Sequence, residues 1–169
     1  MSRFFYNSLC SRQQGFTIIE ILVTIVILSI GLLGIAGLQL TGLRANHSAY
    51  SRTQVSLLAS DMAERLSANL QGVAAGNYDS ITIKPADPQC ISTAAGCTSA
   101  QMAQYDAFEW LTSLGSVLPS GIGTVSGAGA GSTFTITVMW DDTRSGATGT
   151  GCDANNPADL KCFQMLMQP

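Results

Sequence analysis

The chain has 169 residues, the length of one ordinary domain, but 46% of them are hydrophobic and only 11% are charged. A typical soluble domain carries about a quarter charged residues, so this composition indicates a membrane segment rather than a larger core. The formal net charge is -3, and the few Lys and Arg residues do not cluster. This charge argues against a general nucleic-acid binder, and no nucleic-acid partner is expected.

The first predicted element is an apolar run from Phe16 to Leu43 in which Glu20 is the only ionisable side chain. About 20 apolar residues are enough for a helix to cross the hydrocarbon core of a bilayer. A buried core helix of this length would keep a polar face, and a secretory signal would be shorter and end in a small-residue cleavage site. The run therefore predicts a single-pass transmembrane helix.

The same helix is expected to continue beyond the membrane. Its apolar residues then recur at spacings of three and four, which is typical of an amphipathic helix: Val55, Leu58, Met62, Leu66 and Leu70. We expect one helix from about Phe16 to about Leu70, with residues 16–43 in the membrane and residues 44–70 amphipathic. Gly72 and Gly76 are expected to end it.

Four glycines lie in the second half of the apolar run, namely Gly31, Gly34, Gly37 and Gly42. Each weakens the helix. They favour either close helix packing through small residues or local melting of the helix during assembly, and the sequence does not separate the two.

The remainder, residues 71–169, predicts an α+β head domain on a small antiparallel sheet. Its expected elements are a short strand at 81–83, a loop at 85–98, a helix from about Ser99 to Leu118, a Gly-rich connection at 119–131, a strand at 132–140, a polar loop at 141–159 and a terminal strand at 162–167. Trp110 and Trp140 are expected in the core. The predicted fold is thus a long N-terminal helix packed on a small antiparallel sheet, with a second helix.

The five cysteines divide around the apolar run, with Cys10 before it and Cys90, Cys97, Cys152 and Cys162 after it. If the membrane separates a reducing side from an oxidising side, four cysteines remain to form two disulfides. Pairing of neighbours in the sequence is the simplest of the three possible connectivities. No CxxC spacing favours zinc, and no metal is predicted, although the loop at 153–159 offers oxygen ligands that leave calcium as an alternative.

Catalytic chemistry has little support. His47 is the only histidine and lies in the amphipathic part of the long helix, so a His-centred triad in the head domain is excluded. The Gly-rich segment contains no Lys and no phosphate-loop pattern. We therefore predict no catalytic residue and no cofactor, and a protein that is not an enzyme.

A more specific signal stands where the polar N-terminus meets the apolar run: Gly15-Phe16-Thr17-Ile18-Ile19-Glu20. This motif resembles the processing site of type IV prepilins and type II secretion pseudopilins. The resemblance implies that residues 1–15 are a leader, that a prepilin peptidase cuts between Gly15 and Phe16, and that Phe16 is N-methylated.

The same resemblance gives Glu20 a role in assembly, because it would become the fifth mature residue and meet the amino terminus of a neighbouring subunit. A carboxylate within a membrane segment is costly unless it is paired, which favours a functional role. The alternative is a glutamate solvated at the bilayer interface.

Looser similarities extend the resemblance to minor pilins of the PilV type, also called type IV pilus modification proteins. The segments that carry it are 29–39 (SIGLLGIAGLQ), 108–111 (FEWL), 118–123 (LPSGIG) and 138–142 (VMWDD). They imply a low-abundance subunit that helps to initiate pilus assembly, anchored in the inner membrane with its head domain in the periplasm. The implied partners are the prepilin peptidase, other minor and major pilins, the inner-membrane assembly platform and membrane lipid.

Two other functions stay open at this point. One is a minor pseudopilin of a type II secretion system, which shares the leader and the helix. The other is a membrane-anchored binding module that is never polymerised.

Overall fold

The computed structural model describes residues 15–169, so residues 1–14, Cys10 among them, lie outside the described part. The chain divides into two compact units, Met1–Arg44 and Ala45–Pro169. We call them the apolar unit and the folded unit and describe each by itself. The first helix, α1 (Ile18–Ala68), contributes residues to both.

Within the apolar unit, every residue from Gly15 to Leu43 is exposed. Among the described residues, α1 is the one helix long and apolar enough to cross a membrane. Its few hydroxyls donate to carbonyls one turn earlier, as Thr24 does to Ile21 (2.8 Å) and Ser29 to Ile25 (2.7 Å). These bonds satisfy the hydroxyls within the helix, as an apolar surrounding requires.

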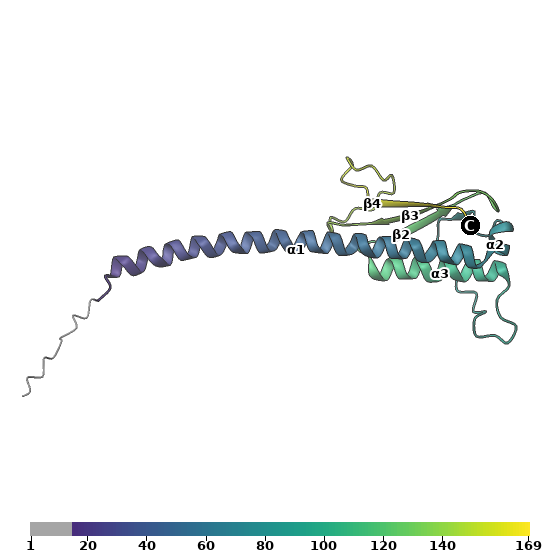
Figure 1. The fold of residues 1–169 in the computed structure, drawn as a ribbon, viewed down its shortest axis with the longest axis horizontal. Helices are drawn as coiled ribbons and strands as arrows, with labels where there is room; N and C mark the ends of the chain where they lie inside the picture. Colours follow the sequence, from purple (N-terminus) through teal and green to yellow (C-terminus); the bar gives the residue numbers. More distant parts are fainter. Residues whose placement is uncertain (1–14) are drawn as a thin grey trace, which may run out of the picture. The chain divides into compact units, whose positions relative to one another are not determined.

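In the folded unit, α1 buries one face through residues spaced by three or four: Ser51, Val55, Ala59, Met62 and Leu66. The helix α3 (Ser99–Val117) packs against the same core with Ala103, Ala107, Trp110 and Leu114. The two helices are joined by a hydrogen bond from Nε1 of Trp110 to the carbonyl of Leu58 (2.8 Å). The predicted amphipathic helices therefore supply one layer of the core (Figure 1).

The second layer is an antiparallel sheet with the order β1-β2-β3-β4. Its strands are β1 (Ser80–Ile81), β2 (Ile122–Ser126), β3 (Phe134–Trp140) and β4 (Lys161–Met167). The register pairs Val125 with Ile136 and Ile136 with Met165, so that one face of the sheet points toward the helices. The predicted fold class, a long helix on a small antiparallel sheet with a second helix, is confirmed.

The predicted end of the long helix is wrong in detail. The long helix ends at Ala68 rather than near Leu70, and a short helix α2 (Leu70–Ala74) follows it, with Gly72 inside α2 rather than at the end of the long helix. The side chain of Asn69 accepts a hydrogen bond from the Gly72 N–H (3.1 Å) and caps α2, which provides the break without Pro or Gly.

The predicted Gly-rich connection at 119–131 contains strand β2. Glycine inside this strand has a packing reason, because a Cβ on Gly123 would lie 2.4 Å from the Trp110 ring. The glycine lets the indole pack directly on the backbone of the strand, a known role of glycine in strands. The strand predicted at 81–83 is also shorter than expected, since only Ser80–Ile81 pairs with β2.

The carboxylate of Asp106 is buried in the folded unit with its hydrogen-bond partners around it. Asp106 accepts hydrogen bonds from the Tyr78 hydroxyl (2.5 Å) and from Arg65 (3.2 Å), and Asn69 donates to the Tyr78 oxygen (3.0 Å). Burial and the hydrogen bond to Asp106 raise the pKa of Tyr78 far above its usual value. This network ties α1 to α3 near the end of the long helix.

Candidate processing and assembly site

The candidate processing site lies at the start of α1. Thr17 caps this helix, because its side-chain oxygen accepts from the Glu20 N–H (3.3 Å) and its carbonyl accepts from the N–H groups of Glu20 and Ile21 (3.1 and 3.3 Å). The cap satisfies N–H groups that the first turn leaves free. This role of Thr17 was not predicted from the sequence, although the spacing Thr-x-x-Glu is the usual signal for it.

Gly15 and Phe16 precede the helix and are exposed, Phe16 by 79%. A Cβ added to Gly15 would meet no atom within 4 Å. Nothing in the described fold therefore requires glycine at this position. The bond between Gly15 and Phe16 lies outside regular secondary structure, where a peptidase can reach it.

Glu20 lies in the first turn of α1 and is exposed. A carboxylate there interacts favourably with the positive end of the helix dipole. Within the described part of the chain, no basic group lies within 4 Å of this carboxylate. Glu20 is thus available to a cation from outside the described residues.

The four glycines of the apolar unit have open surroundings, because a Cβ at Gly31, Gly34, Gly37 or Gly42 would meet no atom within 4 Å. Packing inside this chain therefore does not explain them. The open space around these glycines is compatible with both explanations, close approach of a neighbouring helix and local melting of α1.

The four cysteines after the apolar run form two disulfides in the structure. Cys90 pairs with Cys97 at a Cα–Cα distance of 4.9 Å, and Cys152 pairs with Cys162 at 5.5 Å. The first closes the loop before α3 and the second fastens the 141–160 loop to β4. Both bonds join residues near each other in sequence and hold segments without secondary structure of their own.

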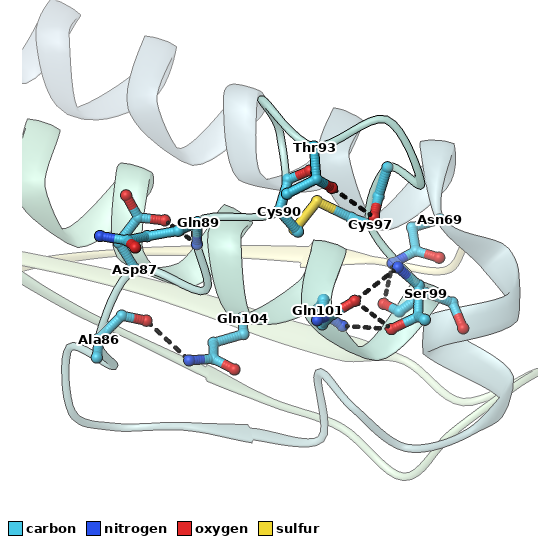
Figure 2. Close-up of a disulfide and its surroundings, with 12 residues drawn as sticks. Asn69, Ala86, Asp87, Gln89, Cys90, Thr93, Cys97, Ser99, Gln101 and Gln104 are labelled. Carbon is cyan, nitrogen blue, oxygen red and sulfur yellow. Dashed lines mark hydrogen bonds between the residues drawn. A yellow bond between two sulfur atoms is a disulfide. The ribbon is translucent and has the colours of Figure 1, made fainter.

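Figure 2 shows how the loop around Cys90–Cys97 is attached to the helices. Gln104 of α3 donates to the Ala86 carbonyl (2.8 Å), and Asn69 donates to the Ser99 carbonyl (2.8 Å). Thr98 and Gln101 form a capping box at the start of α3. The loop is therefore held against the rest of the folded unit.

Two carboxylates of the loop at 141–160, Asp141 and Asp159, hold turns of the loop itself. Asp141 accepts from the N–H groups of Ser145 (3.0 Å) and Gly146 (2.7 Å), and Asp159 accepts from the Asp153 N–H (3.0 Å). Burial opposes ionisation of Asp141, but these hydrogen bonds lower its pKa. Within residues 15–169, no group of three or more His, Cys, Asp or Glu side chains is arranged to hold a metal ion.

Comparison with known proteins gives two family matches. Residues 10–36 match the prokaryotic N-terminal methylation motif, and residues 37–108 match the family described as type IV pilin Tt1218. No curated protein and no solved structure matches the chain significantly. The first match contains Gly15, Phe16 and Glu20, and the second begins within α1 and ends within α3.

Together these matches support a type IV pilin. Pilins are structural subunits, and the methylation motif indicates a pilin that is processed by a prepilin peptidase. The apolar helix and this motif also fit a membrane-anchored pilin.

Proposed function

We propose that this protein is a minor subunit of a type IV pilus. A prepilin peptidase removes residues 1–15, Phe16 is N-methylated, and Glu20 guides the mature subunit into the filament during initiation of assembly. The observation that carries the proposal is the match to the N-terminal methylation motif over residues 10–36. The exposed Gly15-Phe16 bond and the exposed apolar part of α1 support it.

Electrostatics explain why cleavage and Glu20 belong together. Cleavage after Gly15 creates a positive amine directly before the first turn of α1, at the end of the helix that already carries partial positive charge. That amine is unfavourable there unless an anion lies near it. Glu20, the only ionisable side chain from Phe16 to Leu43, supplies a carboxylate at this depth in the membrane.

In this proposal the mature subunit waits in the inner membrane with its folded unit in the periplasm. The inner-membrane assembly platform then moves it into the filament, where other minor and major pilins contact its exposed apolar helix. Membrane lipid covers that helix before assembly. An oxidising periplasm also suits the two disulfides of the folded unit.

The first experiment measures the intact mass and the N-terminal residue of the protein purified from its native membranes. We expect a chain that begins with N-methylated Phe16. Gly15→Leu should retain residues 1–15 while leaving the folded unit intact, because no described atom lies near Gly15. A wild-type chain that still begins at Met1 would contradict the proposal and favour the anchored binding module.

The second experiment tests Glu20. Glu20→Ala should still fold and be cleaved but should be depleted from sheared pili. Because Glu20 also lies in the capped first turn of α1, Thr17→Ala serves as the matched control: it removes the cap but keeps the carboxylate. Equal depletion in both variants would assign the effect to helix capping, and wild-type incorporation of Glu20→Ala would exclude the role in assembly.

A minor pseudopilin of a type II secretion system is the second candidate, since the methylation motif is expected in both systems. Deletion of the gene distinguishes them. Loss of surface piliation with normal enzyme secretion supports the pilus, and the opposite result supports the secretion system.

A further inference from the structure

The last strand of the sheet, β4, is an open edge. It forms backbone hydrogen bonds to β3, and within residues 15–169 no backbone bond links its residues to any other segment. Only Lys161 at its start is charged, and residues 162–167 contain neither Pro nor a charged side chain. Sheets normally protect an edge of this length with charges, Pro or a bulge, so the edge favours pairing with another strand.

The core beneath β4 is also incomplete. Phe163, Met165 and Met167 point toward the helices but remain half-buried, whereas Phe134, Ile136 and Val138, their partners on β3, are fully buried. The difference follows from position, because β3 has a strand on each side and β4 has one on only one side. A further strand beside β4 would bury the three side chains.

A cavity of about 370 Å³ lies where this edge meets α1. Its apolar wall includes Val55, Trp140 and Phe163, and Arg52 of α1 and Lys161 of β4 bring two cations to it. Within the described chain no carboxylate lies within 4 Å of either cation. Burial opposes ionisation of Asp142, but the hydrogen bonds that it accepts from Ser48 (2.7 Å) and Trp140 (3.0 Å) lower its pKa, and Arg52 adds a smaller effect in the same direction.

We propose that an extended segment of another protein chain pairs with β4 and places a carboxylate between Arg52 and Lys161. The open backbone of β4 specifies an extended peptide, because another strand satisfies its N–H and C=O groups in register. The two cations specify an acidic side chain, and the apolar wall accommodates the carbon atoms that carry it. A lipid headgroup would supply the anion but would leave the backbone unpaired.

This inference rests on the proposed function in one respect, since a neighbouring subunit or assembly partner is the natural source of the segment. It can fail independently of that function, because the peptidase acts on residues 15 and 16, outside the folded unit. The N-terminal residue of the same preparation therefore reports on processing, while the contact at β4 is measured separately.

The experiment uses photo-cross-linking of the full chain in its native cells, with p-benzoylphenylalanine as the probe. The probe replaces Gln164 on the exposed face of β4, and the matched control carries it at Thr124 on β2, on the same face of the sheet but two strands away from β4. We expect a defined protein adduct from position 164 and none from position 124. Mass spectrometry should map the adduct to an extended segment that contains Asp or Glu.

Charge reversal then tests the cations. Arg52→Glu combined with Lys161→Glu should reduce the adduct at least about tenfold, because like charges would face each other. Lys84→Glu reverses an exposed cation elsewhere and should leave the adduct unchanged. Replacing the mapped carboxylate of the partner by Lys should restore the adduct with the double variant, and formation of both disulfides in every variant shows that the folded unit is intact.

Four results would overturn the proposal. They are equal adducts from positions 164 and 124, an adduct that is insensitive to charge reversal, an adduct with lipid only, and a mapped segment without a carboxylate. An adduct of two copies of this chain that maps to an acidic extended segment supports the proposal and identifies a second copy as the partner.

Discussion

The two parts of α1 put similar apolar residues to different uses. In the apolar unit, Leu33 and Leu38 are 74% and 76% exposed, while in the folded unit Val55 and Leu66 are completely buried. In the apolar unit the apolar residues cover all sides of the helix, whereas in the folded unit they recur at every third or fourth residue on one face. The apolar character of the first part therefore serves an external apolar environment, and that of the second part serves the core of the protein itself.

Because of this difference, mutations in the two units should affect different properties of the protein. Substitutions in the apolar unit should change insertion, processing or assembly and leave the folded unit stable. Substitutions on the buried face of the folded unit should change its stability first.

Trp110→Ala should have the largest effect on the folded unit. The indole is fully buried and donates to the Leu58 carbonyl, so its removal leaves a large cavity and removes the hydrogen bond that joins α3 to α1. We expect a loss of about 3–5 kcal/mol in the free energy of unfolding. The measurement is urea unfolding of the full chain in detergent, followed by near-ultraviolet circular dichroism. The control is Leu33→Ala, which should not shift the transition, and a shift as large as that of Trp110→Ala would contradict the division.

Removal of Cys152–Cys162 should have the second largest effect. The double variant Cys152→Ser with Cys162→Ser should lose about 2–4 kcal/mol, because the segment between residues 152 and 162 is then unconstrained in the unfolded state. We also expect protease cleavage within this loop, while the loop held by Cys90–Cys97 stays protected. Cleavage of both loops at the same rate would show that the disulfides act on one cooperative structure rather than on separate loops.

Glycine to alanine changes should have opposite signs in the two units. Gly123→Ala forces a methyl group against the Trp110 ring and should destabilise the folded unit by about 1–3 kcal/mol. Gly34→Ala meets no atom and should strengthen the helix by up to about 1 kcal/mol. Urea unfolding measures the first, and helix content in detergent measures the second. If Gly34→Ala also lowers incorporation into pili, a neighbouring helix or local melting requires this glycine.

The sequence predicted those parts of the fold whose signals are local and repeated. The periodic apolar residues of α1 and α3 and the alternation of β3 were enough to place these elements. Strand β2 was missed because Gly123 and its flanking glycines suggest a turn, and only the Trp110 ring explains the glycine. The end of α1 at Ala68 was missed because a side-chain cap at Asn69, rather than Pro or Gly, sets it.

The candidate sites divide in the same way. Gly15, Phe16 and Glu20 form a contiguous motif, so the sequence was enough to nominate them, and the Thr17 cap could have been found from the same six residues. Arg52 and Lys161 are far apart in the chain, and only the packing of α1 against β4 brings both to one cavity. The sequence therefore could not predict that these two cations share one site, because no local pattern links them.

Acid should produce the smallest effect, and it should be confined to the folded unit. The hydrogen bonds that Asp141 and Asp142 accept lower their pKa values relative to the unfolded chain, despite the opposing effect of burial. Their contribution to stability is therefore complete above the ordinary carboxyl pKa of about 3.9 and is lost as the pH falls through the lower pKa values of the folded state. We expect the urea midpoint to decrease below about pH 4 from this contribution.

Two variants of the same loop test this origin of the acid sensitivity. Asp141→Asn should lower the urea midpoint at neutral pH and make the midpoint less sensitive to acid. Asp153→Asn changes a more exposed carboxylate and should show the same acid sensitivity as the wild type. An unchanged pH profile in Asp141→Asn would mean that the turn at Ser145 and Gly146 does not depend on the charge of Asp141.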